Sequence, residues 1–183
     1  MNEPLSEPQT VWRFMRRYSV RIVIGAVLLL VVMIAIRLDA AFRLEQSIAD
    51  KITLCGGEVT LAPVLPNWVP KILRDRFCLV VSIRFKEHPP SDDVLSDIGA
   101  LRGLVNLSLM HPSTSDSDLR QLERLIHLQI LNLSNSQVSD AGLKHLYGMK
   151  KVVALQLRNT NVSEEGRTVL RKALPGCKIT PDP

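Results

Sequence analysis

The sequence predicts an α/β fold: a solenoid with short parallel strands on its concave face and short helices on its convex face, following a single N-terminal transmembrane helix. Three observations lead to this prediction. An uncharged apolar run lies near the N-terminus, and an apolar pattern with a period of 24 residues fills the second half of the chain. The composition agrees, because 46% of the 183 residues are apolar and only 4% are aromatic, which predicts an aliphatic core.

The predicted transmembrane helix covers residues 19–38. From Ile22 to Ile36 the chain carries no charge, and as a helix these residues span about 22 Å at about 1.5 Å per residue. The flanking residues bring the span close to the ~30 Å of a bilayer core, because Arg21 and Arg37 can extend their guanidinium groups to the interface. We therefore expect residues 19–38 to contact the lipid bilayer.

The charges around this helix predict its orientation. Four arginines precede it, whereas the flank that follows it carries charges of both signs. Positive charge is retained on the cytoplasmic side, so residues 1–18 are predicted to be a cytoplasmic tail and the rest of the chain to lie outside the cytoplasmic (inner) membrane. A cleaved signal peptide is the main alternative, although its n-region would be about twenty residues long and only residues 38–40 faintly resemble a cleavage site. A buried core helix is another.

The net charge does not indicate a nucleic-acid partner. It is +5 for the whole chain, but the first 38 residues hold five arginines and two glutamates, a net charge of +3. The rest is spread over many charges of both signs, and aromatic stacking surface is scarce. The positive charge is therefore typical of a membrane flank, and no nucleic-acid partner is expected.

The repeat is the most informative feature of the sequence. Shifting the chain by 24 positions superimposes six columns of apolar residues without an insertion. Residues 80–183 are therefore predicted to form four 24-residue repeats with a C-terminal cap, in which Cys177 and Ile179 close the last unit. Two of the columns are Ile83, Leu107, Leu131 and Leu155, and Phe85, Leu109, Leu133 and Leu157.

Within each unit the apolar spacing changes from two to about three and a half. The first part predicts a short strand and the second a short helix, whose buried face in the third unit is Leu143, Leu146 and Met149. An acidic column stands at the start of each helix, and a serine precedes it in three units. We expect both residue types to cap their own helix, by satisfying its free N–H groups and complementing its dipole. The acidic column is Asp92, Asp116, Asp140 and Glu164, and the serines are Ser115, Ser139 and Ser163.

The L-x-x-L-x-L unit, as in Leu128-Gln-Ile-Leu131-Asn-Leu133, resembles that of the leucine-rich-repeat family. The resemblance extends from Val80 to about Ile179 and implies a curved solenoid with one strand and one helix per unit. Two segments are also similar to parts of short bacterial leucine-rich-repeat proteins with a single membrane helix. These segments are Val138-Ser-Asp-Ala-Gly-Leu143 and Leu174-Pro-Gly-Cys177.

Two departures from the family pattern concern the turns. The family's asparagine column holds other residues, so an uninterrupted asparagine ladder cannot form there. Only two units keep the glycine of the Asp-x-Gly turn, Gly142 and Gly166, which leaves the turn geometry of the first two units open. The asparagine column holds His88, Pro112, Ser136 and Thr160.

Residues 39–79 do not follow the repeat and are predicted to form a juxtamembrane segment and an N-terminal cap, because the first unit needs a cover for its apolar end. An apolar stripe predicts that the membrane helix continues until Gly56-Gly57 ends it. A short strand is expected over residues 58–62 and a short helix over 67–77, with Trp68 on the first repeat strand or, alternatively, at the membrane interface. The stripe is Leu38, Ala41, Leu44, Ile48 and Ile52.

The sequence carries no pattern that predicts catalysis, a cofactor or a metal. It lacks G-x-S-x-G, H-E-x-x-H, C-x-x-C and phosphate-loop motifs, and its four histidines share no repeat column. Cys55, Cys78 and Cys177 are expected to be structural thiols, with a Cys55–Cys78 bridge as the alternative. We therefore predict no catalytic, cofactor-binding or metal-binding residues, and an enzyme is the least favoured class.

The predicted concave face is the candidate binding surface. Side chains that alternate with the buried leucines point onto it, and most of them are small and polar. Four strands form a sheet only about 15–20 Å wide, so a loop, a peptide or an envelope polymer fits better than a large partner. The predicted partner-binding residues are Arg84, Lys86, Asn106, Ser108, Met110, Ile130, Asn132, Ser134, Gln156 and Arg158.

These features predict a non-catalytic, membrane-anchored interaction module that binds a protein, peptide or envelope component through its repeat surface. Fold alone does not identify a ligand, so two alternatives stay open. One is a structural, envelope-organising protein whose concave face is an ordinary solvated surface. The other is a subunit of a membrane complex, recruited through the transmembrane helix, in which Gly25-Ala26 allows close helix approach. The oligomeric state is not predicted.

Overall fold

A computed structural model describes residues 9–64, 67, 69, 78–85, 88–101 and 103–180 of the chain. The chain divides into two compact units between Ala41 and Phe42, and helix α1 (Gln9–Leu54) begins in the first unit and ends in the second. The expectations for Trp68 and Lys86, for most of the helix at 67–77 and for the two chain ends lie outside the described residues.

The first unit consists of the N-terminal part of α1 and contains the predicted membrane segment. Nothing in the sequence of α1 interrupts a helix, because it holds no proline and one glycine, Gly25. The side chains from Ile24 to Leu38 are all exposed and mostly apolar. Among the described residues, α1 is the one helix that is long and apolar enough to cross a membrane.

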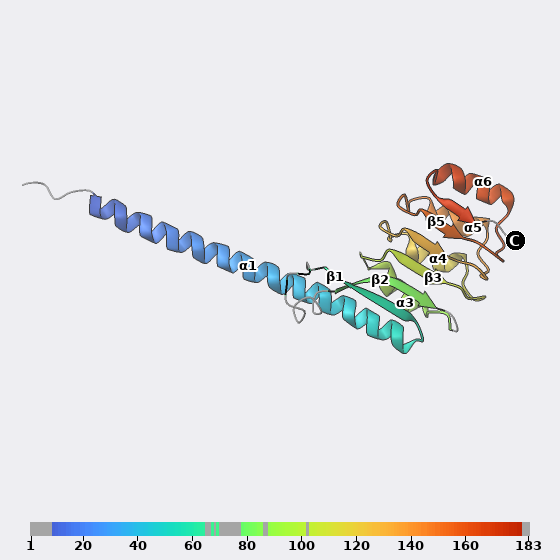
Figure 1. Cartoon of the computed structure of the whole chain (residues 1–183), viewed down its shortest axis with the longest axis horizontal. Coiled ribbons are helices and arrows are strands. Elements are labelled where there is room, and N and C mark those ends of the chain that lie inside the picture. Colours follow the sequence, from blue (N-terminus) through green and yellow to red (C-terminus); the bar gives the residue numbers. More distant parts are fainter. Residues whose placement is uncertain are drawn as a thin grey trace, which may run out of the picture. The chain divides into compact units, whose positions relative to one another are not determined.

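The second unit is built on a six-stranded sheet in the order β1-β2-β3-β4-β5-β6 (Figure 1). β1 (Glu58–Pro63) pairs antiparallel with β2, and the other neighbours are parallel. In the parallel part, partners are 24 positions apart: Ser82, Asn106, Ile130, Ala154 and Lys178 lie side by side. The parallel strands are β2 (Cys78–Phe85), β3 (Asn106–Leu109), β4 (Ile130–Asn132), β5 (Ala154–Gln156) and β6 (Lys178–Thr180).

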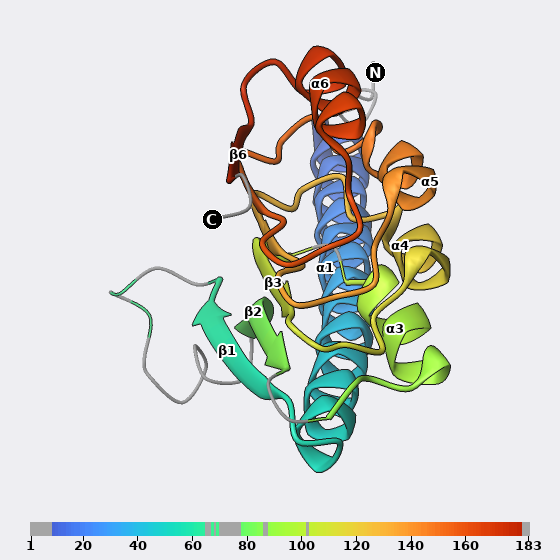
Figure 2. The ribbon, with the colours of Figure 1, turned by 90° about the vertical axis from the view of Figure 1, so that its right-hand side faces the viewer.

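Short helices line one side of this sheet. Figure 2 shows α3, α4, α5 and α6 following one another along that side. The leucines of the repeat columns fill the space between helices and strands, and Leu107, Leu131 and Leu155 are fully buried. The helices are α3 (Asp92–Gly99), α4 (Asp116–Leu122), α5 (Asp140–Leu143) with the 3-10 turn η1 (Lys144–Leu146), and α6 (Glu164–Ala173).

The C-terminal end of α1 covers the first repeat, with a face that follows the predicted stripe at Ile48 and Ile52 but not at Leu44. Ile48 and Ile52 are buried as expected, but Leu44 is 59% exposed. The stripe that turns inward passes through Glu45 instead, whose Oε2 accepts a hydrogen bond from the backbone N–H of Val80 at 2.9 Å. This N–H lies where the pairing of β1 with β2 shifts register, so it needs an acceptor outside the sheet. A pattern of apolar residues in the sequence cannot predict that a carboxylate lies on the buried face of a helix.

Helix α1 ends at the predicted glycines. Gly56 has a φ of 80°, and the N–H groups of Gly57 and Gly56 donate to the carbonyls of Ile52 and Thr53 at 2.9 and 3.0 Å. These two bonds form a Schellman motif, which requires a residue that tolerates positive φ. The chain then enters β1, which confirms the expected short strand.

The four acidic residues lie in the first turn of their own helices, where they complement the helix dipole as expected. Contrary to expectation, the carboxylates of Asp116 and Asp140 bond a serine of the following unit. Asp116 accepts hydrogen bonds from both the N–H and the hydroxyl of Ser139, at 2.8 and 2.6 Å, and Asp140 bonds Ser163 in the same way at 2.9 and 2.6 Å. The serines do cap their helices, since Ser139 and Ser163 accept from backbone N–H groups of α5 and α6. The carboxylates thus join the start of α4 to that of α5 and the start of α5 to that of α6, because the following serine lies within reach.

Candidate functional site

Residues of the predicted concave face gather around one groove. Two rows of side chains cross the parallel strands there, in register from β2 to β5. The groove has a volume of about 420 Å³. It is lined by Arg84, Asn106, Ser108, Met110, Ile130, Asn132 and Gln156, all of which are among the predicted partner-binding residues.

The remaining two described residues of the prediction do not line this groove. Ser134 is buried and Arg158 is exposed, and both follow the last residue of a strand rather than continuing it. The chain turns there because Asn135 and Asn159 adopt positive φ values of 59° and 52°. The third predicted row therefore leaves the sheet after Met110.

Side-chain hydroxyl groups and a pair of asparagines form hydrogen bonds at these turns. Ser136 and Thr160 donate their hydroxyl hydrogens to the carbonyls of Leu133 and Leu157, at 2.6 and 2.9 Å. Asn159 donates to the side-chain oxygen of Asn135 at 2.8 Å, so an asparagine pair does form, one column earlier. Asparagine tolerates the left-handed conformation better than most residues, which was the available signal in the sequence.

The middle of the groove holds a buried hydroxyl group. Ser108 is only 6% exposed, and its Oγ has no hydrogen-bond partner among the residues that the structure describes. A buried polar group without a partner costs about 1–3 kcal/mol. Ser108 is therefore the strongest indication that a ligand atom completes this site.

The neighbours of Ser108 in the same row also face the groove with hydrogen-bond donors. The Oδ1 of Asn132 accepts the N–H of Ser134 at 3.0 Å, so its Nδ2 points the other way and donates to the Sδ of Met110 at 3.1 Å. On the other side, Arg84 makes an ion pair with Glu58 at 3.5 Å, and both side chains are more than half exposed. Thioether sulfur is a weak acceptor and an exposed ion pair is weak, so both donors remain available.

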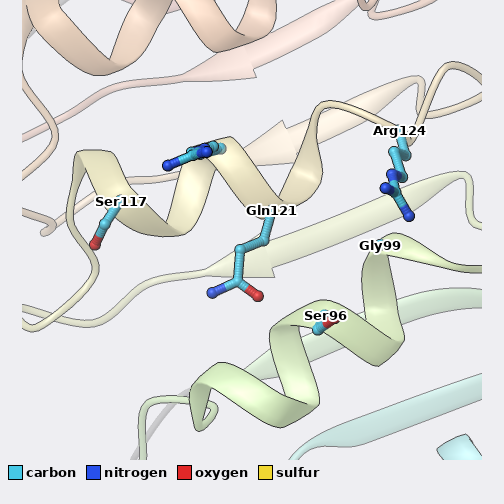
Figure 3. A pocket seen from close by; sticks show the side chains of 6 residues that line it. Ser96, Gly99, Ser117, Gln121 and Arg124 are labelled. Carbon is cyan, nitrogen blue, oxygen red and sulfur yellow. The ribbon is translucent and has the colours of Figure 1, made fainter.

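A second groove lies between α3 and α4, where the sequence analysis predicted no site. It has a volume of about 440 Å³ and is lined by Ser96, Gly99, Ser117, Arg120, Gln121 and Arg124. Figure 3 shows Gln121 and Arg124 extending toward α3. Its long side chains come from α4 and the turn after it, whereas most residues of the first groove lie on strands. Arg120 lies on α4 and Arg124 in the turn that follows it, and this pair of arginines close together in the sequence was the signal that could have indicated the groove.

The histidines and cysteines form no shared centre within the part of the chain that the structure describes. His145 bonds Glu123, and the Nζ of Lys151 bonds the Nδ1 of His127 at 2.9 Å. Cys55, Cys78 and Cys177 are not joined by disulfides, and burial raises the pKa of Cys177. No group of three or more metal-ligating side chains occurs among the described residues.

Comparison with known proteins adds no assignment to this site. No family model matches the chain, and no curated protein matches it. The residues and their geometry are therefore the basis of the functional argument.

Proposed function

We propose that this chain is a non-catalytic interaction module of the leucine-rich-repeat type, anchored in a membrane, which binds a protein, peptide or envelope component in the concave groove. The observation that carries the proposal is the groove itself. Strands β2 to β5, with Met110 directly after β3, present seven side chains to one cavity, and the buried hydroxyl of Ser108 has no hydrogen-bond partner among the described residues. Such an arrangement is typical of a site with a few positioned polar groups.

The solenoid is supported by the sheet and by the sequence together. Parallel strands in a register of 24 residues, with one helix after each strand from β2 to β5, are what stacking of the repeated unit would produce. The α1 segment would anchor the module in the cytoplasmic membrane, with the arginine-rich N-terminus in the cytoplasm and the repeats outside.

Binding without catalysis follows from the chemistry of the lining residues. The groove contains an arginine, a serine, two asparagines, a glutamine and two apolar residues, and none of these seven is a histidine, cysteine or carboxylate. A serine nucleophile needs a general base within hydrogen-bonding distance. Ser108 has no such base among the groove residues.

Quantitative crosslinking with mass spectrometry in native membranes tests this proposal. A variant with Asn106→Glu, Ile130→Glu and Asn132→Glu blocks the groove with negative charge. A matched control carries Ser96→Glu, Ser117→Glu and Gln121→Glu in the groove between α3 and α4. We expect the first variant to lose specific partners while it stays folded, and the control to keep them.

The same experiment separates the two alternatives. Partners that persist in both variants but disappear when residues 22–36 are replaced by an unrelated apolar helix indicate a membrane-complex subunit. If no partner depends on either region, the binding proposal is wrong and a structural role is favoured.

A further inference from the structure

One row of side chains in the groove, Arg84, Ser108 and Asn132, is rich in hydrogen-bond donors. Arg84, Ser108 and Asn132 lie directly abreast on β2, β3 and β4. Neighbouring strands are about 4.8 Å apart, so a ligand group above Ser108 lies within hydrogen-bonding reach of both other side chains.

All three side chains offer hydrogen-bond donors to that position. The guanidinium of Arg84 has donors only. The hydroxyl of Ser108 has no partner among the described residues and can donate, and the amide of Asn132 has its oxygen engaged by Ser134, so its NH₂ group is the part that faces the groove. A partner with several acceptor lone pairs and a negative charge satisfies such a row best.

The rest of the lining favours a peptide as the carrier of that charge. The side-chain amides of Asn106 and Gln156 each combine a donor and an acceptor, as does every unit of a peptide backbone. Met110 and Ile130 provide apolar contacts, and Ile130 is 37% exposed. The described lining residues include no aromatic ring on which a sugar could stack.

From this geometry we infer that the groove binds an extended acidic peptide, with the carboxylate of one Asp or Glu side chain seated over Ser108 between Arg84 and Asn132. This inference rests on the proposed function and specifies its ligand. An aliphatic neighbour of the acidic residue packs against Met110 and Ile130.

Glu58 makes the inference testable in the direction of tighter binding. Its carboxylate pairs with Arg84 at 3.5 Å and occupies the same guanidinium that the ligand needs. The change Glu58→Gln removes a carboxylate that competes with the ligand for Arg84. It also removes a negative charge that repels the carboxylate of the ligand. It therefore strengthens binding of the acidic peptide, whereas a loss of structural support would weaken it.

The experiment uses the full chain in nanodiscs and an array of paired short peptides. The two members of each pair differ only in a central Glu or Gln, and the other positions are randomised among neutral residues. We expect the Glu members to bind about tenfold more tightly, which corresponds to one charge-assisted hydrogen bond. Arg84→Gln and Ser108→Ala abolish most of this preference, and Glu58→Gln increases it.

The matched control is Arg158→Gln, which removes an equal charge from an exposed arginine that does not line the groove. It leaves the preference unchanged. Equal binding of Glu and Gln members, or a preference that survives Arg84→Gln, overturns the carboxylate inference. The proposed function still stands in that case if the Asn106, Ile130 and Asn132 variant loses its crosslinked partners. An array without any binding overturns the peptide ligand, and the crosslinking result then decides the proposed function separately.

Discussion

Two glycines determine how neighbouring helix starts are joined. A Cβ atom on Gly142 would collide with Oδ1 of Asp116, and one on Gly166 would collide with Oδ1 of Asp140. These are the carboxylates that bond Ser139 and Ser163. In the second repeat, the position that corresponds to Gly142 and Gly166 holds Asp118. Its carboxylate accepts a hydrogen bond from the N–H of Ser115, in the same repeat, at 2.9 Å. The third and fourth repeats therefore have a glycine and a bond from the preceding repeat, whereas the second has an aspartate that closes the turn by itself.

We predict that Gly142→Ala lowers the free energy of unfolding by about 2–4 kcal/mol. The added methyl displaces the Asp116 carboxylate and breaks two charge-assisted hydrogen bonds to Ser139. Chemical denaturation followed by circular dichroism measures the change. The matched control is Gly148→Ala, because a Cβ there meets nothing within 4 Å, and we expect less than about 0.5 kcal/mol.

A double-mutant cycle provides the internal check of this mechanism. Once Asp116→Ala has removed the carboxylate, the new methyl group of Gly142→Ala meets only the Cδ1 of Leu119, at 3.1 Å, and the change costs much less than in the native background. Additive effects of the two changes would show that the collision is not the cause.

The thiol of Cys177 is predicted to react slowly with alkylating reagents. Burial disfavours the thiolate and raises the pKa of Cys177 above its usual value, and only the thiolate attacks. In a chain with Cys55→Ser and Cys78→Ser, the iodoacetamide rate should therefore rise at a higher pH than the rate for glutathione. Because the folded pKa is the higher one, this group also favours unfolding as pH rises through the ordinary thiol range. A pH profile that coincides with glutathione would contradict this expectation.

At the scale of secondary-structure elements, the pattern of the repeat predicts strands and helices well, and contacts between units poorly. The apolar columns indicated the strands and the buried helix faces, because burial depends on the type and spacing of residues within one unit. The hydrogen-bond partners of Asp116 and Asp140 were missed because each serine is 23 positions away, in another repeat. The third row of the groove was misplaced because the strands end before Ser134, at turns set by Asn135 and Asn159.

Helix α6 allows a pH test of an element. Glu164, in its first turn, bonds Arg171 at 2.8 Å and Arg167 at 3.3 Å, and these hydrogen bonds lower the pKa of Glu164. The stabilisation is present above the ordinary glutamate pKa and is lost as pH falls through the lowered one. We expect Glu164→Gln to reduce Tm by about 1 °C at neutral pH, since the pair is exposed, and to have a smaller effect near pH 3. Glu165→Gln, at the adjacent exposed position, serves as the control, and an equal loss at both pH values would contradict this account.

At the scale of the whole molecule, the apolar part of α1 allows a test of the proposed membrane anchor and of its orientation. If the proposed anchor is correct, the chain resists carbonate extraction and retains an N-terminal tag. A C-terminal alkaline phosphatase fusion is active and an N-terminal one is not, because the arginines hold the N-terminus in the cytoplasm. Loss of the tag with release of the repeats from the membrane would indicate a cleaved signal peptide.

The junctions formed by Asp140, Ser163 and Gly166 have a consequence for the growth of the chain by tandem duplication. Consider a copy of residues 128–151 inserted directly after the original. The Asp140 of the original then meets Ser139 and Gly142 of the copy, and the Asp140 of the copy meets Ser163 and Gly166. Each new junction thus has the same aspartate, serine and glycine as an existing one. A copy of residues 104–127 instead places Asp118 where the preceding Asp116 needs a glycine. Lengthened variants should therefore fold when the third unit is duplicated and lose stability when the second one is, which makes the third unit the one from which longer chains of this type can be built.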